Sequence, residues 1–420
     1  MIANMDRRSF TPAQRRLLQA AIAVWSPLLP RLRHSIPAKR LVVALAVLTE
    51  WCSADGSHAQ NLTGQLNIHD PSTVIELDGR YYVFWTGQRV RTKFSDNLTN
   101  WTEGPRVFGS PPDWTSMSVP GNTGNFWAPD IAYFNNRYHL YYSVSTFGSQ
   151  ESAIGLATNP TLDPSDPAYE WTDQGPVIES NVGDAYNTID PNIIQTSRGE
   201  IWMTFGSFWT GIYTRRIDPS TGLPLAPPRG TSYGPFRLAF NSAIEAPYIH
   251  ERDGNFYLFV NWGSCCQGSN STYNIRVGRS TNISGPYLDQ NGVNMINNAG
   301  TPFLATEGNF IGPGHISIFT AHGTEWFGYH YYDGERNGDS RYNLRAMRWT
   351  AKGWPVAGPP FPIPEPNSLG LGIALVPWLL TIRACKSGNM NDIGRRRMKL
   401  SAGRNERSAG WRRARCLESS

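Results

Sequence analysis

Cysteine, charged residues and long apolar runs are all scarce in this chain, and each shortage excludes a class of protein. Five cysteines among 420 residues provide neither the disulfide framework of a small secreted domain nor a zinc-binding pattern. Charged residues make up only 17% of the chain, which argues against disorder across its middle. One apolar run, residues 369–382, is short for a transmembrane helix and contains a proline. No long stretch shows the period of an amphipathic helix.

Aromatic residues, glycine and proline are abundant instead. Aromatics are 12% of the chain, which also contains 40 glycines and 31 prolines. This mixture is typical of many short strands joined by tight turns and is unsuited to a helical protein. We therefore expect an all-β domain over residues 61–366.

The positive net charge comes from the two ends of the chain. The total of +5 combines +7 on residues 1–40, +8 on residues 383–420 and about −10 on residues 41–382. The body is therefore acidic, whereas a nucleic-acid-binding domain needs basic residues on its own surface. We expect no nucleic-acid partner.

The ends also differ from the body in composition. Residues 1–59 combine a basic stretch, a short apolar core at residues 41–48 and small residues around Ala54 and Ala59, which is the order of a secretory signal. Residues 367–420 form a basic tail that we interpret as lying outside the domain, with a membrane anchor as the alternative. We expect a secreted, extracellular monomer without stable membrane association. Five Asn-x-Ser/Thr sequons agree mildly with secretion: Asn61, Asn97, Asn100, Asn270 and Asn282.

One pattern occurs five times along the body. Each copy runs from a polar turn into a hydrophobic strand, a Gly- or Asn-rich turn and an aromatic strand. The polar residues at the heads of the copies lie roughly 55 to 70 residues apart and are Asp70, Asp130, Asp190, Glu245 and His315. This repeat predicts a five-bladed β-propeller whose strand starts, and active site, converge on the central axis. A β-sandwich is the alternative, but it does not explain the recurring head.

Three of these heads place an acid beside a proline-containing turn. They are the segments His69-Asp70-Pro71, Ile189-Asp190-Pro191 and Glu245-Ala246-Pro247. A single Asp before Pro is usually a turn former, whereas several in phase place carboxylates around one axis. Carboxylates gathered in an aromatic pocket favour glycosidic bond cleavage, which needs one protonated acid and one ionised carboxylate. We expect Asp130, which follows its proline, to be structural.

The ordered motifs HDPS, WAPDI, DPN, EAPY and GPGH resemble glycoside hydrolase family 43, and within it the endo-1,5-α-L-arabinanases. The resemblance covers roughly residues 61–360. It implies a five-bladed propeller and an inverting mechanism. It also implies Asp70 as the general base, Glu245 as the general acid and Asp190 as the residue that tunes the pKa of the acid and orients it. Inversion requires the two reacting carboxyl groups to lie about 6.5–9.5 Å apart.

The same resemblance places His315 near a central cation, usually calcium. A histidine that only hydrogen-bonds within the channel is the alternative. Because a hard cation prefers oxygen ligands, calcium at this point would be held mostly by water. We expect no organic cofactor.

Aromatic and polar residues beside the heads are candidates for sugar binding. A flat ring can cover the C–H face of a sugar, and each such ring could instead pack between blades. The candidate substrate-binding residues are Phe126, Trp127, Asn187 as a hydrogen-bond donor, Ser207, Phe208 and Trp209. The adjacent Cys265 and Cys266 also resemble a pair in arabinanases. We interpret them as structural or redox-inert, because the sequence around them shows no histidine partner.

The resemblance leads to an endo-acting arabinanase that cleaves the α-1,5-linked arabinan side chains of pectin. One alternative is an exo-acting α-L-arabinofuranosidase or β-xylosidase with the same propeller, which requires a loop that closes one end of the groove. The sequence shows no large insertion for such a loop. A sugar-binding propeller without catalysis is a further alternative, although it would not need both an acid and a base.

Overall fold

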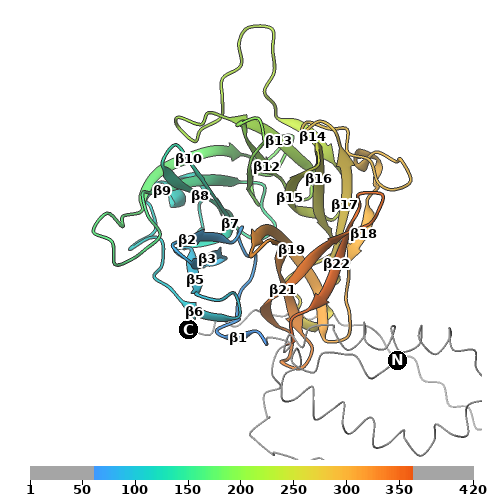
Figure 1. The fold of residues 1–420 in the computed structure, drawn as a ribbon. Helices are drawn as coiled ribbons and strands as arrows, with labels where there is room; N and C mark the ends of the chain where they lie inside the picture. The colour runs from blue at the N-terminus through green and yellow to red at the C-terminus, as the bar shows by residue number, and fades with distance from the viewer. Residues whose placement is uncertain (1–60, 363–420) are drawn as a thin grey trace, which may run out of the picture. The chain divides into compact units, whose positions relative to one another are not determined.

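The computed structural model describes residues 61–362, and these form five β-sheets arranged as blades around a central axis (Figure 1). In blade 1, β2 (Ile75–Leu77) is followed by β3 (Arg80–Trp85), β5 (Arg91–Ser95) and β6 (Asn100–Glu103), and β1 (Thr63–Gly64) pairs with β6. Blade 2 contains β7 (Asn125–Phe134), β8 (Arg137–Val144), β9 (Ser152–Asn159) and β10 (Thr172–Ser180), with β4 (Gly87–Gln88) beside β7.

The other three blades are four-stranded antiparallel sheets in chain order. Blade 3 comprises β11 (Asn192–Gln195), β12 (Ile201–Phe205), β13 (Ile212–Ile217) and β14 (Phe236–Ala239). Blade 4 comprises β15 (Ile244–Arg252), β16 (Asn255–Trp262), β17 (Asn274–Ser280) and β18 (Thr301–Leu304). Blade 5 comprises β19 (Phe310–Ala321), β20 (Thr324–Asp333), β21 (Asp339–Trp349) and β22 (Pro355–Pro360). Short helices lie in the connections: α3 (Trp114–Ser118), η3 (Gly268–Asn270) and η4 (Met295–Asn297).

The predicted propeller is thus confirmed, and its hydrophobic core is distributed between neighbouring blades. Tyr82 and Phe84 of blade 1 share one buried cluster with Leu140 and Tyr142 of blade 2. Each blade buries its alternating side chains against the next one, as expected for sheets that pack face to face. Within residues 61–362, no helix combines the length and hydropathy needed to cross a bilayer.

The first residues of the described chain join the first blade to the last. Strand β1 pairs parallel with β6, while the amide of Leu62 donates to the carbonyl of Pro362 over 2.9 Å. Further along, the amide of Tyr342 in β21 donates to the carbonyl of Leu66 over 2.8 Å. These bonds close the ring. The interpretations of residues 1–59 and 367–420 concern parts of the chain outside the described residues.

Each blade head has one residue in the left-handed region of the backbone. These residues have φ between 41° and 58° and are Asp70, Ala128, Asp190, Ala246 and His315. In β7, β15 and β19 the pairing register with the second strand shifts around this residue, as in a β-bulge. The polar head residues of the repeat are therefore not equivalent in space. Asp70, Asp190 and His315 hold the left-handed position, whereas Glu245 precedes it by one residue and Asp130 follows it by two.

Candidate active site

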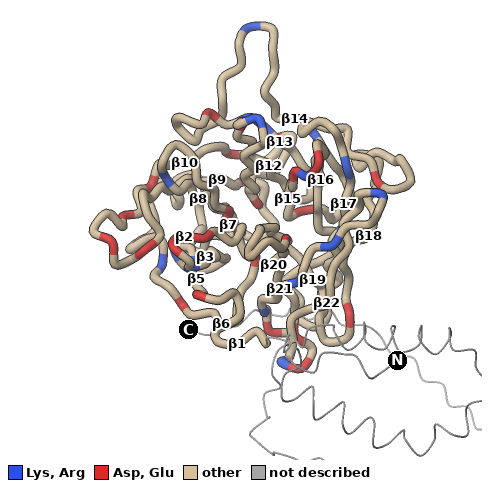
Figure 2. Tube along the Cα trace, viewed as in Figure 1, with Lys and Arg blue, Asp and Glu red and all other residues tan. Residues whose placement is uncertain are grey.

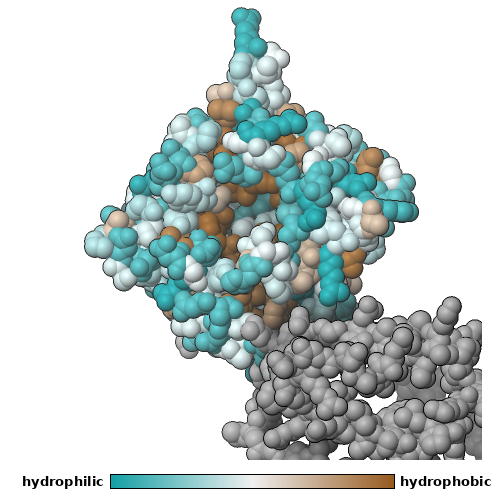
Figure 3. Space-filling view, viewed as in Figure 1, coloured by the Kyte–Doolittle hydropathy of each residue, from teal (hydrophilic) through white to brown (hydrophobic). Residues whose placement is uncertain are grey.

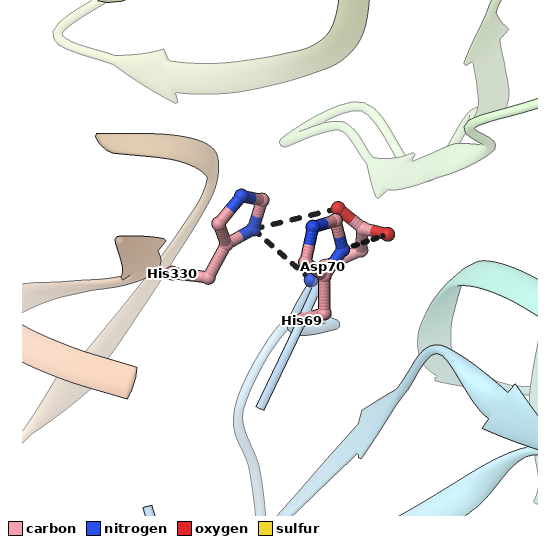
Figure 4. A group of neighbouring side chains, drawn as sticks. All are labelled: His69, Asp70 and His330. Atoms are coloured by element: carbon pink, nitrogen blue, oxygen red, sulfur yellow. Dashed lines mark hydrogen bonds and ion pairs between the residues drawn. The ribbon is translucent and has the colours of Figure 1, made fainter. Parts of the chain in front are cut away.

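Asp70 lies at the start of blade 1, and its carboxylate is surrounded by polar partners. Its Oδ2 accepts a hydrogen bond from Thr86 Oγ1 over 2.7 Å and lies 2.7 Å from Nδ1 of His69. The Asp70 amide donates to Nδ1 of His330 over 3.1 Å. Figure 4 shows the imidazoles of His69 and His330 beside this aspartate. The two rings stack with their centroids 4.1 Å apart, which fixes His69 against a buried neighbour.

The neighbouring His69 keeps Asp70 ionised. Burial alone would raise the pKa of Asp70, but the charge and hydrogen bond of His69 hold it well below its usual range. Burial also opposes protonation of His69, yet the adjacent Asp70 raises the pKa of this imidazole well above its ordinary value. His69 and Asp70 therefore form an imidazolium–carboxylate pair.

Glu245 begins the inner part of blade 4 in an environment that favours its protonated form. It is buried, and its Oε2 accepts a hydrogen bond from Ser207 Oγ over 2.8 Å. Burial raises the pKa of Glu245 to about 7, the Ser207 hydrogen bond opposes this shift, and the negative charge of Asp70 adds to it. A carboxyl group with such a pKa can donate a proton near neutral pH.

Asp190 at the head of blade 3 is attached to the strand that carries Glu245. Its Oδ2 accepts a hydrogen bond from the amide of Ala246 over 3.0 Å, and its own amide donates to Ser143 Oγ over 2.9 Å. Burial, followed by the charges of Glu245 and Asp70, raises the pKa of Asp190 well above its usual value. The three carboxyl groups of blades 1, 3 and 4 are therefore close enough to influence one another electrostatically.

An ionised carboxylate, Asp70, and a protonated carboxyl group, Glu245, therefore lie near the axis of the propeller. Figure 2 shows Asp and Glu near the centre of the ring as well as on its outer loops. The face of the propeller seen in the space-filling view is hollowed near its centre, and hydrophobic side chains line part of the hollow (Figure 3). Two carboxyl groups whose pKa values are pushed apart are what glycoside hydrolysis requires.

Comparison with known proteins agrees with this chemistry. The sequence model of glycosyl hydrolases family 43 matches residues 59–355. This chain belongs to that family.

The family 43 hydrolase is similar to proteins that carry names for arabinan-cleaving activities. An extracellular endo-α-(1→5)-L-arabinanase from Bacillus subtilis is 38% identical over 293 residues, which cover 69% of this chain and 87% of the relative. An extracellular exo-α-(1→5)-L-arabinofuranosidase from Cellvibrio japonicus is 37% identical over 300 residues, covering 69% of this chain and 86% of the relative. Among solved structures, an α-L-arabinanase of Cellvibrio cellulosa complexed with arabinohexaose superposes with a TM-score of 0.67 at 35% identity, covering 70% and 96% of the two chains.

Asp130 of the hydrolase lies outside the group formed by Asp70, Asp190 and Glu245 and connects blades instead. Its Oδ1 accepts a hydrogen bond from the amide of Thr73 in blade 1, and its Oδ2 accepts two from Asn192 Nδ2 and the amide of Ile193 in blade 3. Asn192 in turn accepts a hydrogen bond from the amide of Ile249 in blade 4. Asp130, the second residue after the left-handed position, therefore holds blades 1 to 4 together around the axis.

His315 lies beside Asp70 and is buried. Its Nδ1 lies 3.6 Å from Oδ1 of Asp70, and burial lowers the pKa of its imidazole, which keeps the ring neutral. Within residues 61–362, no side chain or backbone group hydrogen-bonds its Nε2. His69, Asp70 and His330 are close enough to share an ion, but two of these three donors are nitrogens already engaged with Asp70, which does not suit calcium.

The aromatic candidates divide into two groups. Phe208 and Trp209 follow Ser207 in the β12–β13 loop, and both are exposed, by 37% and 41%. Trp127 is half-buried. The prediction for Phe126 is wrong, because its ring is fully buried and packs against Phe108 and Tyr142, with no face free for a sugar.

Asn187 is buried, and its Oδ1 has no hydrogen-bond partner within the described part of the chain. The sequence predicts that Asn187 donates a hydrogen bond to substrate, whereas the unpartnered atom is an amide oxygen, which can only accept one.

The reason for interpreting Cys265 and Cys266 as inert does not hold, because the structure places a histidine beside Cys266. Cys266 Sγ lies 3.8 Å from Nε2 of His69, which is 197 positions away in the sequence. Sequence reasoning also missed His69 itself, His330 and Tyr332. A signal was present for these residues, since His69 immediately precedes Asp70, and His330 and Tyr332 alternate in the aromatic strand of the fifth repeat.

Proposed function

We propose that this hydrolase cleaves internal α-1,5-linkages of arabinan, the arabinofuranose side chains of pectin, with inversion at the anomeric carbon. The observation that carries the proposal is the pairing of Asp70, whose pKa is held low, with Glu245, whose pKa is raised to about 7. The names of the similar proteins supply the sugar: several are arabinanases, and one was solved with arabinohexaose.

In the proposed mechanism, ionised Asp70 acts as the general base. It accepts a proton from a water molecule that attacks the anomeric carbon from the side opposite the leaving group. The contacts from Thr86 and His69 hold the carboxylate in place for this step. Protonated Glu245 donates its proton to the leaving glycosidic oxygen, and Asp190 orients the strand of the acid through the amide of Ala246.

The exposed rings of Phe208 and Trp209 provide stacking surfaces next to the acid. Ser207 contacts Glu245 directly, and the free oxygen of Asn187 accepts a hydroxyl of the sugar. Trp127 adds a partly accessible wall at the head of blade 2.

Hydrolysis of linear α-1,5-arabinan, followed over time by chromatography of the products, tests this proposal. Endo action gives a ladder of oligosaccharides that shortens with time. Release of one product size alone would instead indicate exo action, the activity named for the Cellvibrio japonicus relative. Absence of any product from the secreted, folded enzyme would overturn it. NMR of the first product separates inversion from retention at the anomeric carbon.

Two variants assign the roles of the acids. Asp70→Asn should abolish turnover of every substrate while the circular dichroism spectrum stays unchanged. Glu245→Gln should abolish turnover of arabinan but retain more activity on an aryl arabinofuranoside, because a phenolate leaving group needs little protonation. Equal losses on both substrates would contradict Glu245 as the acid.

We also propose a calcium ion near His315, an extracellular location and a monomeric state. A bound ion would supply positive charge and ordered water beside Asp70. Metal analysis of the purified enzyme before and after chelation tests for the ion, and a His315→Ala variant should lose it. The extracellular names of the relatives support an extracellular location. Fractionation of cultures tests this location. Light scattering of the purified enzyme tests the monomeric state.

A further inference from the structure

The loop between β16 and β17 brings two adjacent thiols to the entrance of the site. Cys266 is exposed, and Cys265 is partly buried. Cys266 holds a left-handed conformation with φ of 63°, and its amide donates to the hydroxyl of Tyr332 over 2.7 Å. This bond anchors the loop, so the position of the Cys266 side chain is set by blade 5.

A continuous set of contacts runs from the Cys266 thiol to the proposed base. Its sulfur lies 3.8 Å from Nε2 of His69, and the same nitrogen lies 2.8 Å from the hydroxyl of Tyr332. On its other side, the His69 ring contacts Asp70 through Nδ1 at 2.7 Å. One imidazole therefore separates the exposed thiol from the carboxylate that activates water.

The surroundings of Cys266 suit a reactive thiolate. A hydrogen bond from Cys265 lowers the pKa of the Cys266 thiol, burial opposes the shift, and the hydrogen bond and charge of His69 lower it further. By contrast, the hydrogen bond to Cys266, followed by burial, raises the pKa of Cys265. A thiolate next to a protonated imidazole and accessible to solvent is the form that attacks disulfides.

We propose that Cys266 is a covalent modification site for low-molecular-weight disulfides and that its modification stops hydrolysis at the neighbouring carboxylates. The thiolate attacks one sulfur of the reagent RSSR, the S–S bond breaks, and the thiolate RS⁻ leaves and takes a proton from water. Cys265 then supplies the second thiol. Its sulfur, after losing its proton, displaces a second RS⁻ from Cys266 and leaves a Cys265–Cys266 disulfide, so one RSSR is reduced to two RSH.

Inactivation follows from the position of the adduct. A group attached to the Cys266 sulfur occupies the space between His69 and the solvent, and it displaces the contact on Nε2. The adduct therefore blocks access of substrate. Because His69 holds Asp70 through its other nitrogen, the adduct also displaces the base. A displacement of about 1 Å at a reacting group costs on the order of a hundredfold in rate.

The test treats the full-length enzyme with the neutral disulfide 4,4′-dithiodipyridine, followed by peptide mass spectrometry and an arabinan assay. The activity arm rests on the proposed function, whereas the mass arm does not. In the wild type we expect modification at Cys266 before the other cysteines, conversion to a Cys265–Cys266 disulfide, and loss of activity of about a hundredfold that dithiothreitol restores.

Two variants, each compared with its own untreated activity, identify the thiol. Cys266→Ser should keep its activity under treatment, and Cys265→Ser should be inactivated and retain the mixed disulfide on Cys266. Inactivation of Cys266→Ser at the wild-type rate would overturn the proposal, as would a fully modified wild type with undiminished turnover. If the untreated enzyme does not cleave arabinan, the proposed function fails, and preferential labelling of Cys266 still decides the site.

Discussion

The three aspartates at the blade heads are the same type of residue, but they differ in role because they occupy different positions relative to the left-handed residue. Asp70 and Asp190 hold the left-handed position, which turns their carboxylates toward the other acids. Asp130 lies two residues beyond that position, and its carboxylate meets the amides of neighbouring blades instead. Unfavourable backbone conformations of non-glycine residues persist where the surrounding structure enforces them, and they occur often at active sites.

The pH profile tests the environment of Glu245. Because the proposed acid must be protonated and its pKa is raised to about 7, activity should decline as the pH rises through that value. The Ser207 hydrogen bond stabilises the ionised form, so Ser207→Ala should move this decline upward by about one unit, given roughly 1.5 kcal/mol for a hydrogen bond to a charged group. The measurement is kcat/KM on arabinan against pH, and an unmoved or lowered limb would contradict the assignment.

Two aromatic substitutions should have opposite consequences. Trp209→Ala should weaken arabinan binding by about 1 kcal/mol, roughly fivefold in KM, with little change in stability, because the ring is exposed. Phe126→Ala should instead cost about 3–5 kcal/mol of unfolding free energy, because its ring is fully buried among aromatic neighbours. Steady-state kinetics and urea unfolding of both variants measure the contrast; a stable Phe126→Ala enzyme with raised KM would restore this residue as a sugar contact.

At the scale of elements, the inner strands serve as both scaffold and site. Each head contains a left-handed residue, and the amide of that residue donates to a side chain of the preceding blade. These acceptors are His330, Thr86, Ser143, Asp190 and Asn261. Only in blade 4 is the acceptor itself one of the three acids, so the bond that fixes the strand of Glu245 is also a bond within the site.

Asp130 should be essential for stability because of its contacts between blades. Asp130→Ala removes one carboxylate that satisfies two buried amides and one side chain, and we expect a loss of about 3 kcal/mol in unfolding free energy. Asp113→Ala is the matched control, since this aspartate is exposed and its side chain makes no capping bond. Urea unfolding followed by circular dichroism compares the two variants, and equal stabilities would contradict the role of Asp130 in holding the blades together.

At the scale of the whole molecule, closure of the ring makes the blades interdependent. Leu62 is fully buried in a cluster that combines residues of blade 1 with Tyr342 and Leu344 of blade 5. Its own amide and the carbonyl of Leu66 make the backbone bonds that join the two blades. Asp70, Asp190 and Glu245 come from blades 1, 3 and 4, so their mutual placement depends on an intact ring.

Disruption of the closure should therefore weaken the entire propeller in one step. Leu62→Ala should cost about 3 kcal/mol and lower the single urea transition seen by both tryptophan fluorescence and near-ultraviolet circular dichroism. Leu140→Ala, at the interface of blades 1 and 2, serves as the comparison and should behave alike. An early separate transition in Leu62→Ala alone would show that blade 5 opens independently.

Much of this arrangement was predictable from sequence, because periodic strands and turns are local signals. The strands around Ile154, Ile212 and Ile275 and the repeat of five units could be located from alternation and turn residues alone. The alignment of the heads by their polar residues was less accurate. Alignment on the residue before the proline would have placed Asp70, Ala128, Asp190 and Ala246 together.

The sequence by itself determined the propeller, the acidic character of its body and the three acids that its heads can bring together, since these depend on residue type and spacing along the chain. Only the tertiary structure decided that Phe126 packs in the core, that Asp130 joins blades, and that His69 lies between Cys266 and Asp70. The last contact joins residues 197 positions apart. Such a contact depends on closure of a ring, which no local pattern encodes.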